Sequence, residues 1–260
     1  MTVPSVSEHA ERRTRALSFG AVAEMYDRHR PAPPQAAVDW LLPERVGAAV
    51  DLAAGTGSLS RRLLARAAEV IAVEPDERMA AVLAHRLPTV RLLVGRAESL
   101  PLPDASVDAV LVSAAWHWFD VEAAAPEIAR VLRPGGLLGI LWTSLDRETA
   151  RGAVLWESAR DLLPHWSDGS ENHRPEGVCL PTGAPFAKPE IKRLRATWRV
   201  SPRRLAEMIG TYSSVITLPS SERERLLVQV LDSVATNPAF AGRKRVSVTL
   251  SCRCWKARRL

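Results

Sequence analysis

The sequence predicts an α/β fold built on a mostly parallel sheet with helices on both faces. Between residues 48 and 142, short apolar runs alternate with segments of helical periodicity, which is the pattern of successive strand–helix–strand units. The runs are continuously apolar and not alternating, which indicates strands buried on both faces. With 260 residues, of which 47% are hydrophobic, the chain is long enough to form one sizeable core.

The first half of the chain predicts its elements in a regular order. Two short helices come first, one ending before Pro31 and one starting at Pro33 and Pro34, because apolar residues there keep helical spacing. The first 18 residues are polar and indicate a frayed leader or a short helix. Core strands are expected at about 48–52, 69–73, 90–94, 108–113 and 137–142. Core helices are expected near 58–67, 76–86 and 122–132.

The pattern changes after Trp142. A helix is expected around 147–163, and the stretch from Pro164 to Pro189 has the composition of a surface loop. Two late strand patterns flank two further helical patterns, which gives strands at 191–199 and 246–256 and helices at 202–211 and 221–235. We expect the late strands to pair antiparallel at one edge of a seven-stranded sheet, with the helices between them as a cap.

These elements predict one domain in three parts. An N-terminal helical lid occupies residues 1–43, and a doubly wound core occupies residues 44–145. Cap helices and the C-terminal edge strands, residues 146–260, complete the same domain. The oligomeric state is left open.

Composition excludes several classes of protein and site. No apolar run approaches the roughly 18–20 residues that a membrane span needs, and the N-terminus lacks the apolar core of a signal peptide, so we expect a cytoplasmic protein without a membrane partner. Three cysteines make neither a disulfide framework nor a four-cysteine zinc site, so Cys252 and Cys254 are expected to be packing positions. The run from His165 to His173 fits no familiar metal spacing, and no metal is expected.

The formal charge of +6 is the one feature that points toward a polyanionic partner, because several arginines lie in the last quarter of the chain. A solvated basic face accounts for the same charge. So does the coding composition of a high-GC bacterial source. Nucleic acid is therefore not the expected partner.

A turn with two glycines is the first candidate for chemistry. The segment from Asp51 to Leu59 passes from a strand through Gly55 and Gly57 into a helix. Glycine can take a positive φ and lets a ligand lie against bare backbone, while the helix start offers free N–H groups. A cofactor is expected at the carboxyl end of this strand. A tight turn without a ligand is the alternative.

Glu74 follows the next strand pattern, 23 residues beyond Asp51. An acidic side chain at that place can accept hydrogen bonds from both hydroxyls of a ribose, which suits nucleoside cofactors in general. The dinucleotide pattern G-x-G-x-x-G is incomplete, because Ser60 stands at its last position.

Four ordered motifs resemble those of class I S-adenosylmethionine (SAM)-dependent methyltransferases, which have a Rossmann-like fold. They are Asp51–Gly57, Val73–Asp76 with Met79, Ala97–Asp108 and Val131–Gly136. Two further matches, Phe19–Pro31 and His117–Asp120, are similar to trans-aconitate and menaquinone-pathway methyltransferases. The clear resemblance covers residues 19–143.

The resemblance implies SAM as cofactor and assigns roles along the chain. Backbone from Ala53 through Ala54, Gly55 and Thr56 to Gly57 borders the methionine moiety, Glu74 holds the ribose, Met79 covers the adenine, and Ala97 and Glu98 meet its edge. The expected cofactor-binding set is completed by Tyr26, Arg30, Asp51, Pro75 and Ser113. Two residues depart from the pattern: Ala53, where the family more often has glycine, and Arg96, where many relatives carry an aspartate.

The segment Ser113–Asp120 follows the fourth strand and is expected beside the reacting methyl group. His117 is the candidate general base, because imidazole titrates near neutral pH. Trp116 and Trp118 are candidate substrate-binding residues, since rings near a sulfonium give a dry wall and cation–π attraction. Core packing and a structural hydrogen bond are the alternative roles. Arg30 could pair with a carboxylate of the cofactor or of an acidic substrate.

The sequence thus predicts transfer of a methyl group from SAM to a small-molecule acceptor, with oxygen favoured as the methylated atom, in bacterial metabolism or natural-product biosynthesis. Three alternatives stay open. One is an RNA-modifying methyltransferase, suggested by the basic C-terminal third. The others are a protein that keeps the fold and cofactor without methyl transfer, and an NAD-dependent dehydrogenase.

Overall fold

The computed structural model describes residues 18–162, 178 and 180–260. The predicted leader up to residue 17 lies outside the described residues, as do the candidate run His165–His173 and most of the loop predicted at 164–189. The expected lid is therefore described from Ser18 onward.

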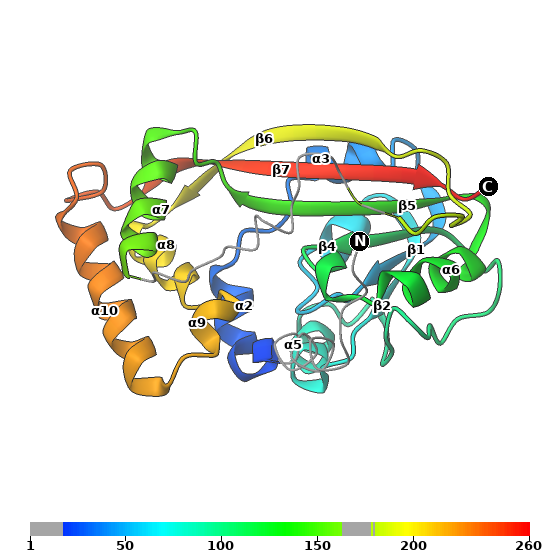
Figure 1. Ribbon diagram of the computed structural model, residues 1–260, viewed down its shortest axis with the longest axis horizontal. Helices are drawn as coiled ribbons and strands as arrows, with labels where there is room; N and C mark the ends of the chain where they lie inside the picture. The colour runs from blue at the N-terminus through cyan, green and yellow to red at the C-terminus, as the bar shows by residue number, and fades with distance from the viewer. Residues whose placement is uncertain (1–17, 163–177, 179) are drawn as a thin grey trace.

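The described chain forms one seven-stranded sheet in the order β3-β2-β1-β4-β5-β7-β6, which confirms the predicted fold class (Figure 1). The first five strands run parallel to their neighbours, and β7 runs antiparallel to both β5 and β6. The late strands therefore pair as expected, with β6 at the edge of the sheet. The strands are β1 (Val46–Leu52), β2 (Ala67–Val73), β3 (Arg91–Leu93), β4 (Val107–Ser113), β5 (Leu132–Leu145), β6 (Glu190–Val200) and β7 (Val246–Arg258).

Helices lie before, between and after these strands, close to the predicted positions. They are the 3-10 helices η1 (Ser18–Val22) and η2 (Trp116–Trp118), and the α-helices α2 (Ala23–His29), α3 (Gln35–Leu41), α4 (Ser60–Leu63), α5 (Glu77–Arg86), α6 (Val121–Val131), α7 (Ala150–Leu162), α8 (Pro202–Ile209), α9 (Ser213–Ile216) and α10 (Ser220–Thr236).

Two predicted boundaries are wrong, each because the sheet overrides local pattern. The helix expected at 58–67 is only the single turn α4, because β2 begins at Ala67 and pairs there with Val46. The strand expected at about 137–142 begins earlier, at Leu132, so Pro134–Gly136 lies inside β5, where the pairing with β4 shifts register and Gly135 has a φ of +73°.

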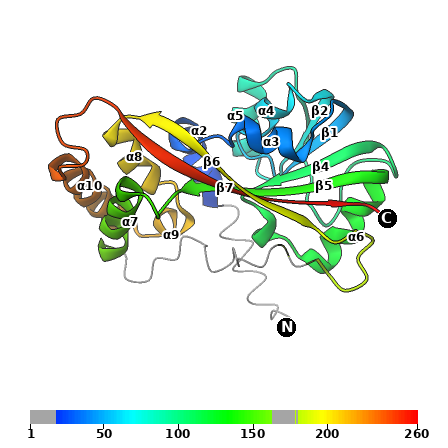
Figure 2. The ribbon, with the colours of Figure 1, turned by 90° about the horizontal axis from the view of Figure 1, so that it is seen from above.

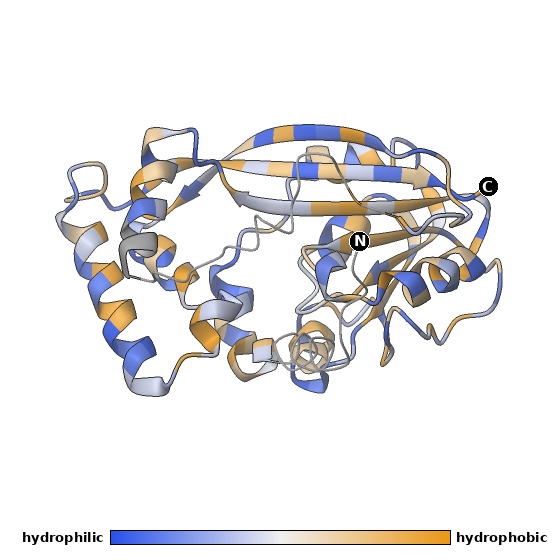
Figure 3. Ribbon diagram, viewed as in Figure 1, coloured by the Kyte–Doolittle hydropathy of each residue, from blue (hydrophilic) through white to orange (hydrophobic). Residues whose placement is uncertain are grey.

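Two apolar layers bury the sheet. On one face, Val50, Val110 and Ile140 belong to a cluster that includes Ala125 and Ile128 of α6. The opposite face packs against α3, α4 and α5, through residues such as Ala49, Leu111, Leu41, Leu63 and Leu83. Cys252 and Cys254 are fully buried in this second layer, in agreement with the packing role expected for them. The edge strand β6 is more exposed, and Figure 3 shows it striped with hydrophilic residues.

The long strands β5, β6 and β7 continue beyond the core and carry the cap at their far end (Figures 1 and 2). Helices α7, α8 and α10 build a separate apolar cluster there with the start of β7. Its members include Leu155, Leu205, Val230, Phe240 and Val246, all at most 4% exposed.

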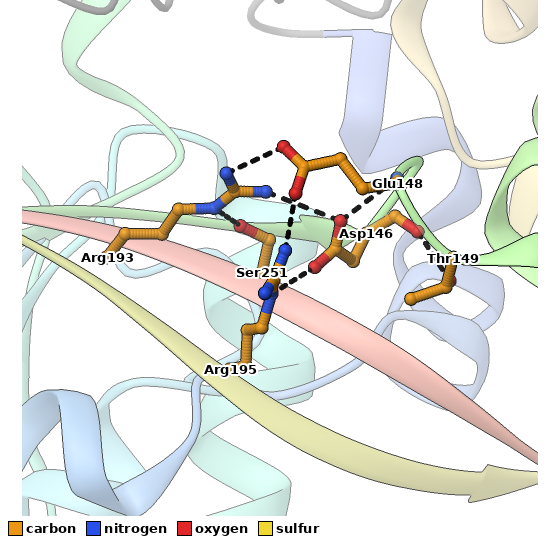
Figure 4. Close-up of polar contacts among 6 residues, drawn as sticks. All are labelled: Asp146, Glu148, Thr149, Arg193, Arg195 and Ser251. Carbon is orange, nitrogen blue, oxygen red and sulfur yellow. Dashed lines mark hydrogen bonds and ion pairs between the residues drawn. The ribbon is translucent and has the colours of Figure 1, made fainter.

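A buried carboxylate holds the junction between sheet and cap (Figure 4). Asp146 directly follows β5, and its side chain is fully buried. It accepts hydrogen bonds from Arg195 Nε at 2.6 Å and Arg193 Nη2 at 3.3 Å, both from β6, and from the Glu148 amide at 3.1 Å. Arg193 also donates to Ser251 of β7 at 2.9 Å. One side chain thus joins the end of β5 to the middle of β6 and to the turn that precedes α7.

Asp146→Ala should lower the free energy of unfolding by about 2–4 kcal/mol, because it removes hydrogen bonds to charged groups at a buried position. Urea denaturation measures the change. Glu148→Gln is the matched control, since Glu148 binds the same two arginines but its side chain is 62% exposed, and it should leave stability nearly unchanged. Equal effects of the two substitutions would contradict this role of Asp146.

The turn after β1 stores backbone strain at a residue other than glycine. Ala53 has a φ of +56°, in the left-handed region that L-residues other than glycine rarely adopt. Gly55 and Gly57 follow with φ values of +57° and +84°. The family's more frequent glycine at position 53 therefore suits this backbone better than alanine does.

Ala53→Gly should raise the free energy of unfolding by roughly 0.5–1 kcal/mol, because relief of the left-handed strain exceeds the extra entropy of glycine in the unfolded chain. Ala54→Gly, at an ordinary backbone conformation, should instead lower it by a similar amount. Thermal and urea unfolding of both variants check the prediction, and a loss of stability in both would refute it.

Candidate functional site

A cavity of about 730 Å³ opens at the carboxyl ends of the first four strands. The strand order reverses between β1 and β4, and parallel sheets bind ligands at such a reversal. Segments directly after β1, β2, β3 and β4 line the cavity, together with two residues of the lid. The lining residues are Phe19, Tyr26, Leu52, Ala53, Gly55, Glu74, Pro75, Met79, Val94, Gly95, Arg96, Ala97, Glu98, Ser113, Ala114, Ala115, Trp118, Phe119 and Asp120.

Glu74 and the glycine turn are joined directly. The Gly55 amide donates to Glu74 Oε2 at 2.8 Å, and the Asp76 amide donates to Glu74 Oε1 at 2.9 Å. One carboxylate therefore orders both the turn after β1 and the chain that enters α5. Each of its oxygens keeps a lone pair for a further donor, as a ribose would supply.

The turn contributes shape more than free N–H groups. Three backbone N–H groups of the turn already donate hydrogen bonds within the protein. Ala54 donates to Val73 O at 3.2 Å, Gly55 to Glu74 Oε2 at 2.8 Å, and Gly57 to Ala54 O at 2.9 Å. A Cβ on Gly57 would lie 2.9 Å from Leu83 of α5, so this glycine permits close packing against the helix. Gly55 instead faces the cavity beside Met79.

Burial changes the acid–base properties of the two carboxylates nearest the turn. It raises the pKa of Glu74 to about 7, against the opposing effect of the two backbone hydrogen bonds. It also raises the pKa of Asp51 to about 6, although Ser60 donates a hydrogen bond to Asp51 Oδ2 at 2.6 Å. Both groups titrate near neutrality and not at the acidic pH usual for carboxyls.

Aromatic rings from the lid and from the end of β4 close one side of the cavity. The Phe19 ring meets Tyr26 edge-on, with centroids 5.7 Å apart, and meets Trp118 at 6.1 Å. The lid packs against α5, where Phe19, Tyr26 and Ala23 form an apolar cluster with Met79 and Val82. A Cβ on Gly20 would meet the Asp76 carboxylate at 2.2 Å, so only glycine allows this contact between η1 and α5.

Another part of the cavity lining is polar and includes Arg96, Glu98 and Asp120. Arg96 Nε lies 3.4 Å from Glu98 Oε2, and Glu98 Oε1 accepts a hydrogen bond from the Asp120 amide at 3.0 Å. Arg96, which stands where many relatives carry an aspartate, lines the cavity. Its guanidinium there pairs with Glu98.

The structure gathers ten of the predicted site residues around this cavity. These are Tyr26, Ala53, Gly55, Glu74, Pro75, Met79, Ala97, Glu98, Ser113 and Trp118. Their common feature is that they follow a parallel strand, begin α5 or belong to the lid.

Other predicted residues lie outside the lining. Trp116 is 5% exposed and packs edge-on against Phe119 in the core, with centroids 5.7 Å apart. The His117 ring lies against Trp118, with centroids 4.4 Å apart, and is not part of the cavity wall. Asp51 and Thr56 are buried, with 1% and 2% of their surfaces exposed, and Ala54 and Gly57 belong to the turn itself. Arg30 donates to Thr211 of the cap instead.

Sequence reasoning missed some lining residues, chiefly Leu52, Val94 and Gly95, whereas Ala114, Ala115 and Phe119 belong to the segment Ser113–Asp120 that it placed beside the reacting methyl group. Val94 and Gly95 directly follow β3, so the rule that ligands bind beyond the carboxyl ends of parallel strands pointed to them. Phe19 was quoted for the resemblance but not placed in the site. The left-handed backbone of Ala114, with a φ of +55°, has no signal in the sequence, because alanine rarely adopts that conformation.

The described residues are free of two features, a cluster of metal-ligating side chains and a membrane-spanning helix. Within residues 18–162, 178 and 180–260, no three acidic, histidine or cysteine side chains come together as metal ligands. Among the helices in the same ranges, none is long and apolar enough to cross a bilayer.

Comparison with known proteins agrees with the site. A family model described as a methyltransferase domain matches residues 50–140. An uncharacterized methyltransferase of Mycobacterium bovis is 39% identical over 246 residues, which cover 95% of this chain and 97% of that protein. A demethylmenaquinone methyltransferase of Thermus thermophilus is 38% identical over 157 residues, covering 58% of this chain and 68% of that protein.

A solved structure from Anaeromyxobacter dehalogenans, described as a type II methyltransferase, has a similar fold. Its TM-score is 0.66 at 26% identity, and the match covers 88% of this chain and 97% of that one. The four motifs, the cavity at the reversal of strand order and the near full-length similarity agree with one another. The chain therefore belongs to the class I SAM-dependent methyltransferases.

Proposed function

We propose that this enzyme transfers the methyl group of SAM to a small-molecule acceptor, with oxygen favoured as the methylated atom. The observation that carries the proposal is one cavity in which Glu74 and the glycine turn face an aromatic wall built from Phe19, Tyr26 and Trp118. A relative named for methylating demethylmenaquinone supports a small-molecule acceptor. Our expectation of a cytoplasmic location rests on the sequence.

The residues around the glycine turn fit the cofactor. Asp51 Oδ1 and Thr56 Oγ1 are buried without a hydrogen-bond partner among the described residues, and such atoms normally have one. Both side chains are buried and do not line the cavity, so the fit rests on Glu74, which lines the cavity and keeps a lone pair on each carboxylate oxygen for a further donor. Glu74 would hold the ribose, Met79 a face of the adenine, and Ala97 with Glu98 the adenine edge.

SAM supplies a methyl group already activated by its sulfonium, so the protein's share of the work is to orient the acceptor and exclude water. The rings of Phe19, Tyr26 and Trp118 would provide a dry wall and attract the positive charge. Ser113 and Ala114, at the end of β4, would border the reacting centre.

The candidate general base, His117, is not among the residues that line the cavity. Its ring packs on Trp118 and would have to turn to reach an acceptor in the cavity. This position favours a mechanism by orientation, with His117 supporting Trp118, for acceptors that ionise readily. An acceptor of high pKa would still need a base.

RNA is a weaker candidate acceptor. The basic C-terminal third suggested it, yet Arg203 is paired with Glu207, and Arg258 and Arg259 donate to the backbone carbonyls of Gly135 and Leu132. Paired arginines are less available to phosphates. Incorporation of labelled methyl groups into total RNA would favour this alternative over ours.

Glu74→Ala should weaken SAM binding by roughly 1–3 kcal/mol, because it removes an acceptor of charged hydrogen bonds from the cavity. Isothermal titration measures the affinity. Glu77→Ala, an exposed residue at the start of α5, is the control and should bind like the wild type. Absence of SAM binding in the wild type, or an unchanged affinity in Glu74→Ala, would overturn the proposed cofactor site. A labelled-methyl screen of candidate metabolites then tests for the acceptor.

SAM affinity should depend on pH through Glu74. With a pKa of about 7 in the free protein, this carboxyl is mostly protonated at pH 6 and mostly ionised at pH 8. Ribose hydroxyls and a sulfonium both favour the ionised form, so the dissociation constant should fall about tenfold from pH 6 to pH 8. Titrations at several pH values measure the change.

The Glu74→Gln variant supplies the control, because its affinity should lose most of this pH dependence. The sign of the effect on stability is opposite. A pKa raised by folding means that the ligand-free protein loses this contribution to stability as the pH rises through 7. An affinity that is flat with pH in the wild type would contradict ionisation of Glu74 on binding.

A further inference from the structure

Arg30, which follows the lid helix α2, reaches the cap and not the cavity. Its Nε donates to Thr211 Oγ1 at 2.8 Å, and its Nη2 donates to the Thr211 carbonyl oxygen at 3.0 Å. The guanidinium carbon also lies over the Tyr212 ring, 4.2 Å from its centroid. Residues 181 positions apart in the sequence are thereby joined.

The same guanidinium contacts a residue of the cofactor cavity. Its carbon lies 5.3 Å from the centroid of Tyr26, whose ring lines the cavity. Tyr26 in turn meets Phe19, and Phe19 meets Trp118. A continuous series of contacts therefore runs from Tyr212 of the cap, through Arg30 and the lid, to the end of β4.

The lid helix depends on such contacts for its position. It has only seven residues, and helices this short have little stability of their own in water. One side of it packs on α5 through the cluster around Met79. Toward the cap it has the Arg30 contacts and a second one, since His29 Nδ1 lies 3.3 Å from Glu207 Oε2 of α8. Figure 1 shows α2 between α5 and the cap helix α9.

We propose that Arg30 is a positioning residue that couples the cap to the cofactor site by holding Tyr26 and the lid over the cavity. The inference rests on the proposed function, because it requires the cavity to bind an adenosyl cofactor. Arg30 then acts through Tyr26 and the lid, and not by pairing with the carboxylate at the amino-acid end of SAM. Events at the cap would therefore alter the affinity for the cofactor.

Two probes separate these roles. S-adenosylhomocysteine carries the amino-acid carboxylate, whereas 5′-methylthioadenosine keeps the adenosine and lacks that carboxylate. Arg30→Met should weaken binding of both by about tenfold and speed their dissociation, because the lid loses charged hydrogen bonds. Arg28→Met, the same change at an exposed position of α2, is the control and should bind both probes like the wild type.

A change on the cap side tests the coupling from the other end. Thr211→Val removes the Oγ1 acceptor of the Arg30 hydrogen bond but leaves the carbonyl acceptor. It should weaken the binding of both probes by about threefold. Thr217→Val is matched to it, because each threonine follows a helix and its Oγ1 donates to a carbonyl of that helix, Thr211 to Met208 O at 2.6 Å and Thr217 to Ser213 O at 2.9 Å. Thr217→Val should not alter binding. The double variant Arg30→Met/Thr211→Val should bind no more weakly than Arg30→Met alone, since both substitutions break one contact.

Three outcomes overturn the inference. One is a loss of affinity for S-adenosylhomocysteine but not for 5′-methylthioadenosine in Arg30→Met, which would mean direct pairing with the carboxylate. The others are wild-type binding by Thr211→Val or by Arg30→Met. If wild-type protein binds neither probe, the proposed function fails. Hydrogen exchange of the α2 amides then tests the contact between Arg30 and Thr211 alone. The α2 amides should exchange faster in Arg30→Met than in Arg28→Met, and equal exchange rates would refute the role of this contact.

Discussion

The hydrogen bond from the Gly55 amide to the Glu74 carboxylate is the contact on which the cavity depends. β1 and β2 are adjacent parallel strands, so the chain leaves both at the same edge of the sheet. The turn after β1 needs left-handed backbone at Ala53, Gly55 and Gly57, a conformation that stays in place only when neighbouring groups hold it. Glu74 holds it at one oxygen and, through Asp76, the start of α5 at the other.

This arrangement places ionisable groups where burial opposes their charge. Glu74 and Asp51 both have pKa values raised toward neutrality, and the Asp51 side chain sits between two apolar layers that bury the sheet. Burying an ionisable group lowers the free energy of unfolding, so such groups are kept mainly where they have a function. Carboxyls with raised pKa values are accordingly common at functional sites. The apolar layers on both faces of the sheet offset this cost. Backbone strain is likewise common at functional sites, and Ala53 and Ala114, two of the three described non-glycine residues with positive φ, border the cavity, whereas the third, Ala105, does not.

The cavity is closed by parts of the chain that are far apart in sequence. The lid supplies Phe19 and Tyr26, while Arg30 ties that lid to Thr211 in the cap. The cap is itself held by the long strands β5–β7 and by the buried Asp146 at their junction. Lid and cap therefore form one connected support for a site whose floor is the edge of the sheet.

Sequence by itself determined the core of this protein. Apolar runs alternating with helical periods predicted the five core strands, separate strand patterns predicted the two late ones, and ten of the nineteen lining residues were among the predicted site residues. These features depend on neighbours along the chain. Tertiary structure alone decided the rest. Neither the short length of α4 nor the β5 strand that runs through Gly135 follows from local pattern, since pairing with neighbouring strands sets both. Arg30 and His117 carry side chains suited to a site, yet one turns to the cap and the other packs on Trp118. Where a polar side chain points depends on which partner lies nearest in space, and a one-dimensional sequence does not contain that distance.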